Sequence, residues 1–277
     1  MQGLVIFLVM IAVPAAIGLY WYIKPKLVHK RRMRQRGLQP PQGLDDVLSR
    51  NVGLYSLLPD DLREQLLGHV NVFLNEKRFR GINGQEITPE VIYTVAGIAC
   101  MLLLNREPTY FPGFSSILIY PDTYEATQVK YDSGVEVRSR SRRAGESWHR
   151  GPIVLSWSDV LAGAVNAGDG YNVVLHEFAH KLDEENSGTN GLPILRDTSH
   201  YKEWADVLGK EYESLGDRVA RHKNKVLDDY GLTSPPEFFA VATESFFEKA
   251  GAMRKRLPAL YEQLRRFYAV DPAKWKH

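Results

Sequence analysis

Residues 172–183, NVVLHEFAHKLD, contain two histidines four residues apart with a glutamate directly after the first. On an α-helix this spacing places His176 and His180 on one face, where both imidazoles can bind the same metal ion. Two imidazoles leave a zinc ion room for a third protein ligand and a water, whose pKa the metal lowers to about 7. Glu177 can take the proton from that water as general base and pass it to a leaving amine. The pattern is the HExxH motif of zinc hydrolases, and it predicts one Zn2+ per chain.

The third metal ligand must come from another part of the chain, and acidic residues on a later helix are the candidates. Glu237 and Glu244 lie two turns apart on the segment PEFFAVATESFF, residues 236–247, and their spacing does not choose between them. Asp183 follows His180 by three residues and lies too far along the helix to bind the metal well, so we expect it to orient a ligand instead. The remaining histidines considered, His149, His200 and His222, have no partner at ligand spacing and are expected to be solvated.

These residues must be positioned by helices and short strands. We therefore predict an α+β fold in which a small mixed sheet lies over the HExxH helix. Apolar periodicity predicts helices over residues 59–75, 88–104, from about 172, 200–212, 237–248 and 257–268. Apolar runs bounded by turn residues predict strands at residues 116–120, 128–138 and 152–160, with the basic run 138–143 as a solvated loop. We expect the strand 152–160 to be the sheet edge that receives an extended peptide.

The N-terminal segment has the length and composition of a membrane anchor. Gly3 to Ile23 carries no charge over 21 residues, and seven Lys or Arg residues follow it before residue 40. By the positive-inside rule this predicts one span with the N-terminus outside. We therefore expect a transmembrane anchor over 1–23, a basic juxtamembrane linker over 24–43, and a cytoplasmic catalytic domain over 44–277 at the inner (plasma) membrane.

Composition and charge narrow the class of protein further. A hydrophobic content of 44% in 277 residues is sufficient for a globular core. The single cysteine, Cys100, excludes an internal disulfide and is expected to be buried. Residues 41–277 hold 28 basic and 33 acidic side chains, a formal charge of −5. This acidic domain argues against nucleic acid as the main partner, because phosphate binding needs a basic face.

Several short motifs resemble, in their order along the chain, those of the MtfA family, the Mlc titration factor A type of zinc peptidase. They are LLP at 57–59, IYP at 119–121, GESW at 145–148 with GPIVL at 151–155, the HExxH segment 176–183, and PEFFAV at 236–241. The resemblance covers most of residues 57–272. It implies a zincin-like fold of the gluzincin type, similar to the catalytic fold of anthrax lethal factor.

The same resemblance implies roles for two further residues. Glu237 stands where the family has its third zinc ligand, which leaves Glu244 a structural or metal-orienting role. Tyr230 falls on the family's active-site tyrosine, although the sequence alone also fits a surface tyrosine after Asp228 and Asp229. A phenol beside zinc can donate a hydrogen bond to the oxyanion formed during amide hydrolysis. The resemblance further implies aminopeptidase activity and binding to a transcriptional regulator resembling Mlc. The family's best-known member is soluble and cytoplasmic. The expected membrane anchor of this chain therefore differs from the pattern of the family.

The sequence therefore predicts a membrane-anchored zinc metallopeptidase that hydrolyses peptide or protein substrates. The alternative is a regulator-binding protein in which zinc holds the site together and peptidase activity is secondary. A third hypothesis is a structural membrane protein with an accidental HExxH motif and no bound zinc. Glu177→Gln separates the first two, because it leaves metal and fold intact and removes only the general base.

Overall fold

The computed structural model describes residues 2–122, 124–132, 135–143, 145–147, 151–186, 188–221 and 226–275. Their side chains are described except at 2–6, 8, 9, 11, 124–132, 135–143 and 145–147. The chain divides into two compact units, Met1–Gln39 and Pro40–His277. Residues 133 and 134 of the predicted strand region 128–138, together with His149 and His222, lie outside the described residues.

The first unit consists of the helix α1, Gln2–Arg36, which includes Pro14 and Pro25. The helical part of the expectation for residues 3–23 is thus confirmed. Within the part of the chain that the structure describes, no helix has both the length and the apolar character needed to cross a membrane. The transmembrane span predicted over residues 1–23 stays a prediction.

The second unit contains a four-stranded sheet in the order β1-β2-β6-β5. The strands β1 (Arg78–Gly81), β2 (Ser116–Tyr120) and β6 (Ile153–Ser156) run parallel, and β5 (Gly145–Ser147) pairs antiparallel with β6. A separate two-stranded ribbon joins β3 (Tyr124–Asp132) to β4 (Val135–Arg143). The small mixed sheet and the α+β class are confirmed.

Three expectations about strands are wrong. The strand predicted over 152–160 ends at Ser156, because the Ser156 hydroxyl accepts a hydrogen bond from the Asp159 N–H and starts the helix α6, Trp157–Val165. This strand is also not a sheet edge, since it pairs with β2 on one side and β5 on the other, so it cannot receive a peptide. The basic run 138–143 is not a loop, because its backbone pairs with β3.

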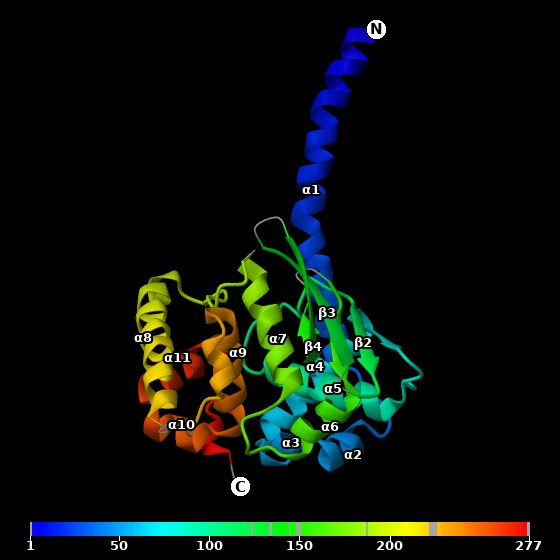
Figure 1. Cartoon of the computed structure of the whole chain (residues 1–277). Helices are drawn as coiled ribbons and strands as arrows, with labels where there is room; N and C mark the ends of the chain where they lie inside the picture. The colour runs from blue at the N-terminus through cyan, green and yellow to red at the C-terminus, as the bar shows by residue number, and fades with distance from the viewer. Residues whose placement is uncertain are drawn as a thin grey trace. The chain divides into compact units, whose positions relative to one another are not determined.

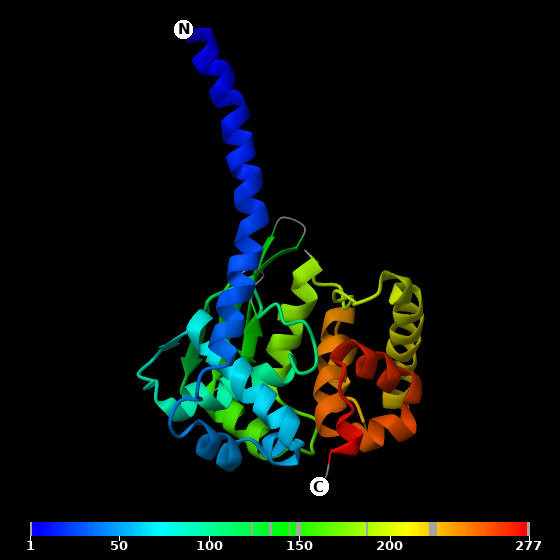
Figure 2. The ribbon, with the colours of Figure 1, turned by 180° about the vertical axis from the view of Figure 1, so that it is seen from behind.

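Helices surround the sheet and account for most of the second unit. Its N-terminal half contributes α2 (Leu44–Asn51), α3 (Gly53–Leu57), α4 (Asp60–Glu76) and α5 (Pro89–Met101). Its C-terminal half contributes α8 (Tyr201–Ala220), α10 (Ala250–Arg256) and α11 (Pro258–Tyr268). Figures 1 and 2 show α7 (Val173–Asp183) and α9 (Pro235–Glu248) side by side between the sheet and the C-terminal helices. The two halves of the unit therefore meet at this helix pair.

An aromatic cluster holds α7 from its buried side. Phe178, which is fully buried, lies 4.8 Å from Phe111 and 5.7 Å from Phe73, measured between ring centroids. The buried Lys77 ammonium donates hydrogen bonds to the carbonyls of Phe111 and Phe114, which fixes the loop that presents these rings. Burial of one phenylalanine contributes about 2–3 kcal/mol to stability. The HExxH helix is thus anchored on the face opposite its histidines, and Cys100 is buried as expected.

Candidate metal centre

The helix α7 begins where it does because Asn172 caps it. The Asn172 side-chain oxygen accepts a hydrogen bond from the Leu175 N–H at 3.1 Å, and its amide donates to the Gly163 carbonyl. A Cβ on Gly163 would lie 2.9 Å from the Tyr171 carbonyl oxygen, so only glycine permits this close approach. The N-terminus of the HExxH helix is therefore fixed against α6.

The helix α9 presents Glu237 in its first turn. Ser234 caps the helix by accepting a hydrogen bond from the Glu237 N–H, and Pro235 occupies the first helical position. A carboxylate in the first turn is favoured by the positive end of the helix dipole. Phe238 and Phe239 follow and pack against Tyr212 and Trp204, which holds this turn in place.

The structure brings His176, His180 and Glu237 together at one point between α7 and α9. The Nε2 atom of His176 lies 2.9 Å from Oε2 of Glu237 and 3.2 Å from Nε2 of His180. The third side of the triangle, from His180 Nε2 to Glu237 Oε2, is 3.3 Å. Three possible ligand atoms from two helices thus converge.

These separations fit a single tetrahedral zinc ion. Zinc bound at about 2.0–2.2 Å by nitrogen and oxygen ligands places neighbouring ligand atoms about 3.3 Å apart. The two imidazoles and one carboxylate are also the donor set that catalytic zinc sites use. Their side chains are only 10–21% exposed, so the cluster is largely but not completely shielded from solvent. The residues present therefore fit the metal.

Glu177 and Tyr230 approach the cluster differently. Glu177 is 5% exposed, and its Oε2 atom is buried with no hydrogen-bond partner among the described residues. Tyr230 lies in the short helix Asp229–Leu232, capped by Asp228, and its ring centre is 6.0 Å from that of His176. Its side chain is 53% exposed. Glu177 is thus buried, whereas Tyr230 is accessible and its ring lies near that of His176.

Burial and neighbouring charges act in opposite directions on the pKa values here. Burial raises the pKa of Glu237, but hydrogen bonds with His176 and His180 outweigh it and lower the pKa below the usual range. Burial lowers the pKa of His176, but contacts with Glu237 and Glu244 raise it well above its ordinary value. Burial raises the pKa of Glu177, and the two histidines partly offset this. The contact between Glu237 and His176 therefore favours the charged form of both side chains.

The other residues weighed from the sequence have distinct positions. Glu244 does not join the three converging atoms; its Oε1 lies 2.8 Å from Nδ1 of His176, on the other side of the ring. Asp183 is fully buried and accepts a hydrogen bond from the Gly191 N–H, and its expected role in orienting a ligand stays a prediction. His200 is exposed, as expected.

Two residues of this centre were not predicted from the sequence. Asn172 caps α7, and Glu248 accepts hydrogen bonds from the Asn172 amide and from the Gly170 N–H, both at 3.0 Å. An asparagine directly before an apolar helical pattern is a recognisable cap signal. Glu248 carries no such signal, because its partners are 76 and 78 residues away in sequence.

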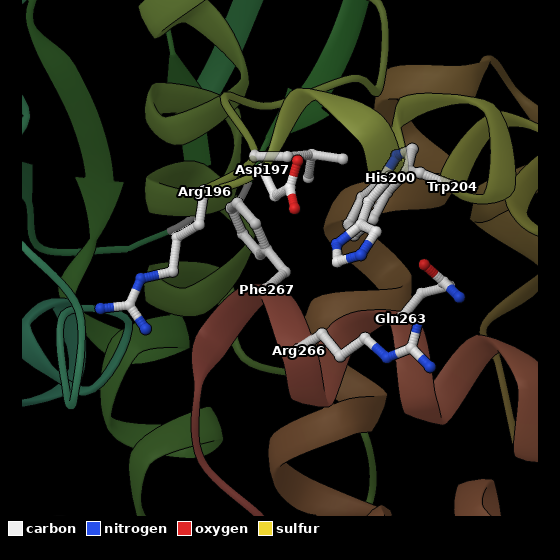
Figure 3. A pocket seen from close by; sticks show the side chains of 8 residues that line it. Arg196, Asp197, His200, Trp204, Gln263, Arg266 and Phe267 are labelled. Carbon is white, nitrogen blue, oxygen red and sulfur yellow. The ribbon is translucent and has the colours of Figure 1, made fainter.

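A small surface pocket lies elsewhere in the C-terminal half, beside α8 and α11 (Figure 3). Trp204 and Phe267 give it apolar walls, and Arg196 extends away from the other labelled side chains. Its lining is Leu195, Arg196, Asp197, His200, Trp204, Gln263, Arg266 and Phe267. It includes none of the residues that the sequence predicted for the metal centre.

A mixed α+β fold with two histidines and a carboxylate converging on one point is the arrangement of a metal-dependent hydrolase. Residues 26–269 match the family described as glucose-regulated metallo-peptidase M90, and the chain belongs to this family. Among its relatives is an uncharacterised protein of Synechocystis sp., 35% identical over 245 residues, which are 88% of each chain. Others are the proteins named Mlc titration factor A of Yersinia pestis and Yersinia pseudotuberculosis, each 31% identical over 228 residues, 80% of this chain and 83% of theirs. The resemblance to the MtfA family is thereby confirmed.

Glu248 gives the folded protein a predicted pH dependence. Burial raises its pKa to about 9; Glu244 and Asp169 add to this, while hydrogen bonds from Asn172 and Gly170 oppose it. Because its ordinary pKa is 4.5, the folded protein retains a proton that the unfolded chain has lost between pH 4.5 and 9. The stabilising contribution is complete below this window and is lost as the pH rises through it.

We therefore expect Glu248→Gln to change how the free energy of unfolding depends on pH. Relative to the variant, the wild type should lose up to about 1.4 kcal/mol for each pH unit above 5. Urea denaturation of both proteins between pH 5 and 8 measures this difference. Parallel curves for the two proteins would contradict the prediction.

Proposed function

We propose that the chain is a zinc-dependent metallopeptidase whose ligands are His176, His180 and Glu237. The observation that carries this proposal is the spacing of their three atoms, which matches one tetrahedral ion beside an HExxH glutamate. Membership of a metallopeptidase family supports the same reaction class. The zincin-like, gluzincin form of the fold is part of this proposal.

In the proposed reaction, water attacks the peptide carbonyl carbon and the C–N bond breaks. A bound zinc ion supplies Lewis-acid polarisation and a lowered pKa for water. Glu177 removes a proton from the attacking water and later delivers it to the leaving nitrogen. Its Oε2 supports this role, because the atom has no hydrogen-bond partner among the described residues and so keeps its capacity to accept a proton. Tyr230 donates a hydrogen bond to the oxyanion of the tetrahedral intermediate.

The general-base role is tested with Glu177→Gln, which preserves the size of the side chain. Purified wild type and variant should each contain about one zinc per chain, and the variant should lose about 10²–10⁴-fold in kcat. The assay uses internally quenched peptides with free and with acetylated N-termini, with and without a zinc chelator. Equal chelator-sensitive cleavage by both proteins would exclude Glu177 as the base.

The free and acetylated peptides also test the aminopeptidase activity, which stays a prediction from the family resemblance. Preference for the free N-terminus would support it.

A second candidate function is regulator binding, which is favoured by the name Mlc titration factor A of the Yersinia relatives. The cleavage assay together with a capture experiment distinguishes it from the enzymatic function. If zinc is present in both proteins and neither cleaves, while both capture a transcriptional regulator resembling Mlc, the binding function replaces the enzymatic one.

The role of Tyr230 is tested by Tyr230→Phe, which removes only the hydroxyl. If the phenol stabilises the transition state, kcat should fall by about 10²–10³-fold with little change in KM or zinc content. Steady-state kinetics on the best peptide from the previous assay measure this. A change confined to KM would assign the tyrosine to substrate binding instead.

We also propose that residues 3–23 anchor the chain in the inner (plasma) membrane with the catalytic domain in the cytoplasm. The support is the uncharged run followed by basic residues in the sequence. When expressed in bacterial cells, the full chain should remain with the membranes after alkaline carbonate extraction, whereas residues 41–277 should be released. Recovery of the full chain in the soluble fraction would refute the anchor.

A further inference from the structure

We propose that Gly191 is a positioning residue that sets how closely the first turn of α9, and with it Glu237, approaches the end of α7. The inference rests on the proposed metal site and adds to it a residue that does not bind the metal. Gly191 lies in the segment between α7 and α8, which passes the start of α9 (Figures 1 and 2).

Contacts at both ends show that α7 and α9 run in opposite directions. Asn172, at the start of α7, contacts Glu248 at the end of α9. His180, near the end of α7, contacts Glu237 in the first turn of α9. The ligand atoms therefore converge where α7 ends and α9 begins, and the segment that contains Gly191 leaves α7 at this end.

The backbone of Gly191 is held by both of the helices that its segment joins. Its N–H donates a hydrogen bond at 2.8 Å to Oδ2 of Asp183, the last residue of α7. Its carbonyl accepts a hydrogen bond at 3.2 Å from the indole N–H of Trp204 on α8. Asp183 and Trp204 are both buried, which strengthens these bonds. Gly191 therefore has a fixed position relative to the turn of α7 that carries His180.

The side of Gly191 that lacks a side chain lies against the backbone of α9. A Cβ on Gly191 would lie 2.8 Å from the carbonyl oxygen of Pro235 and 3.1 Å from its carbonyl carbon. These distances are shorter than van der Waals contact, and a backbone carbonyl cannot rotate away as a flexible side chain can. Pro235 is the first residue of α9 and precedes Glu237 by two residues. A side chain at position 191 would therefore push the ligand turn away from α7.

Alanine at position 191 would also strain the backbone, and Gly84 separates this effect from the contact with Pro235. Gly191 has a φ of +76°, in the left-handed region that favours glycine. Gly84, between β1 and α5, has a φ of +83°, and a Cβ there would meet no atom within 4 Å. Gly84→Ala is thus a matched control that introduces the backbone strain alone.

The experiment compares the full-length wild type with Gly191→Ala and Gly84→Ala. Zinc affinity is measured by competition with chromophoric chelators of graded strength, and fold by circular dichroism and thermal unfolding. We expect the zinc Kd to rise about 10–100-fold in Gly191→Ala and to change less than about 3-fold in Gly84→Ala. Both variants should unfold at a lower temperature than the wild type, because both carry the backbone strain.

A second pair of proteins tests whether Gly191 acts through Glu237. In a Glu237→Gln background the third ligand is already weakened, so adding Gly191→Ala should change the zinc Kd less than about 3-fold. A general structural role would instead raise the Kd by the same factor in both backgrounds, and that result would overturn the inference.

The outcomes separate this inference from the proposed function. An unchanged zinc Kd in a folded Gly191→Ala variant would overturn the inference while leaving the zinc site intact. If that variant does not fold, hydrogen exchange of the wild type decides. Zinc should slow exchange of the Gly191 amide more than that of the β2 amides, because metal binding and the Gly191 contacts stabilise the same arrangement. Equal slowing would contradict the inference, and a wild type that binds no zinc would refute the proposed function together with it.

Discussion

The packing of α7 against α9 is the constraint on which the rest of this structure depends. The helix α7 carries both imidazoles and the helix α9 carries Glu237. Neither helix can therefore form the metal centre alone. Ligand atoms must be placed within a few tenths of an ångström, which requires a fixed distance and rotation between the helices. The aromatic cluster around Phe178 holds α7 from behind, and Trp204 with Tyr212 holds the first turn of α9.

Buried polar groups contact one another between the two helices. Glu244 and Glu248 accept hydrogen bonds from Asn172, Gly170 and His176, and these contacts fix how α7 can rotate against α9. Burying carboxylates is unfavourable unless each finds partners, and removing one partner leaves a charge or donor unsatisfied. Sliding α9 along α7 would break all of these contacts together.

Much of the centre could be predicted from the sequence because its signal is local. The HExxH spacing predicts both histidines on one face of a helix, and the structure has them on the helix α7. The choice between Glu237 and Glu244 could not be made from spacing, and the structure shows why. Both reach His176 from one face of α9, one at Nε2 and the other at Nδ1. The spacing of Glu237 and Glu244 shows that they share a helix face, but it does not show which ring nitrogen of His176 each of them contacts.

The errors of prediction arose where long-range pairing or a single cap decides the outcome. Three apolar residues and Ser156 form the strand that was predicted for 152–160. The Ser156 cap turns the following residues into a helix, and apolar content alone does not distinguish a strand from a helix. Pairing of β6 on both sides is a property of the whole sheet. The basic run in β4 has little intrinsic tendency to form a strand, yet it pairs with β3 across a short connection. Family resemblance supplied Glu237 and Tyr230 where pattern alone left alternatives.

The most direct test of the account is an anomalous-difference map from a crystal of the zinc-loaded protein, with data collected on both sides of the zinc absorption edge. The account predicts one strong peak per chain, within about 2.2 Å of Nε2 of His176, Nε2 of His180 and a carboxylate oxygen of Glu237. A peak bound by Glu244 in place of Glu237, or no peak between α7 and α9, would contradict it.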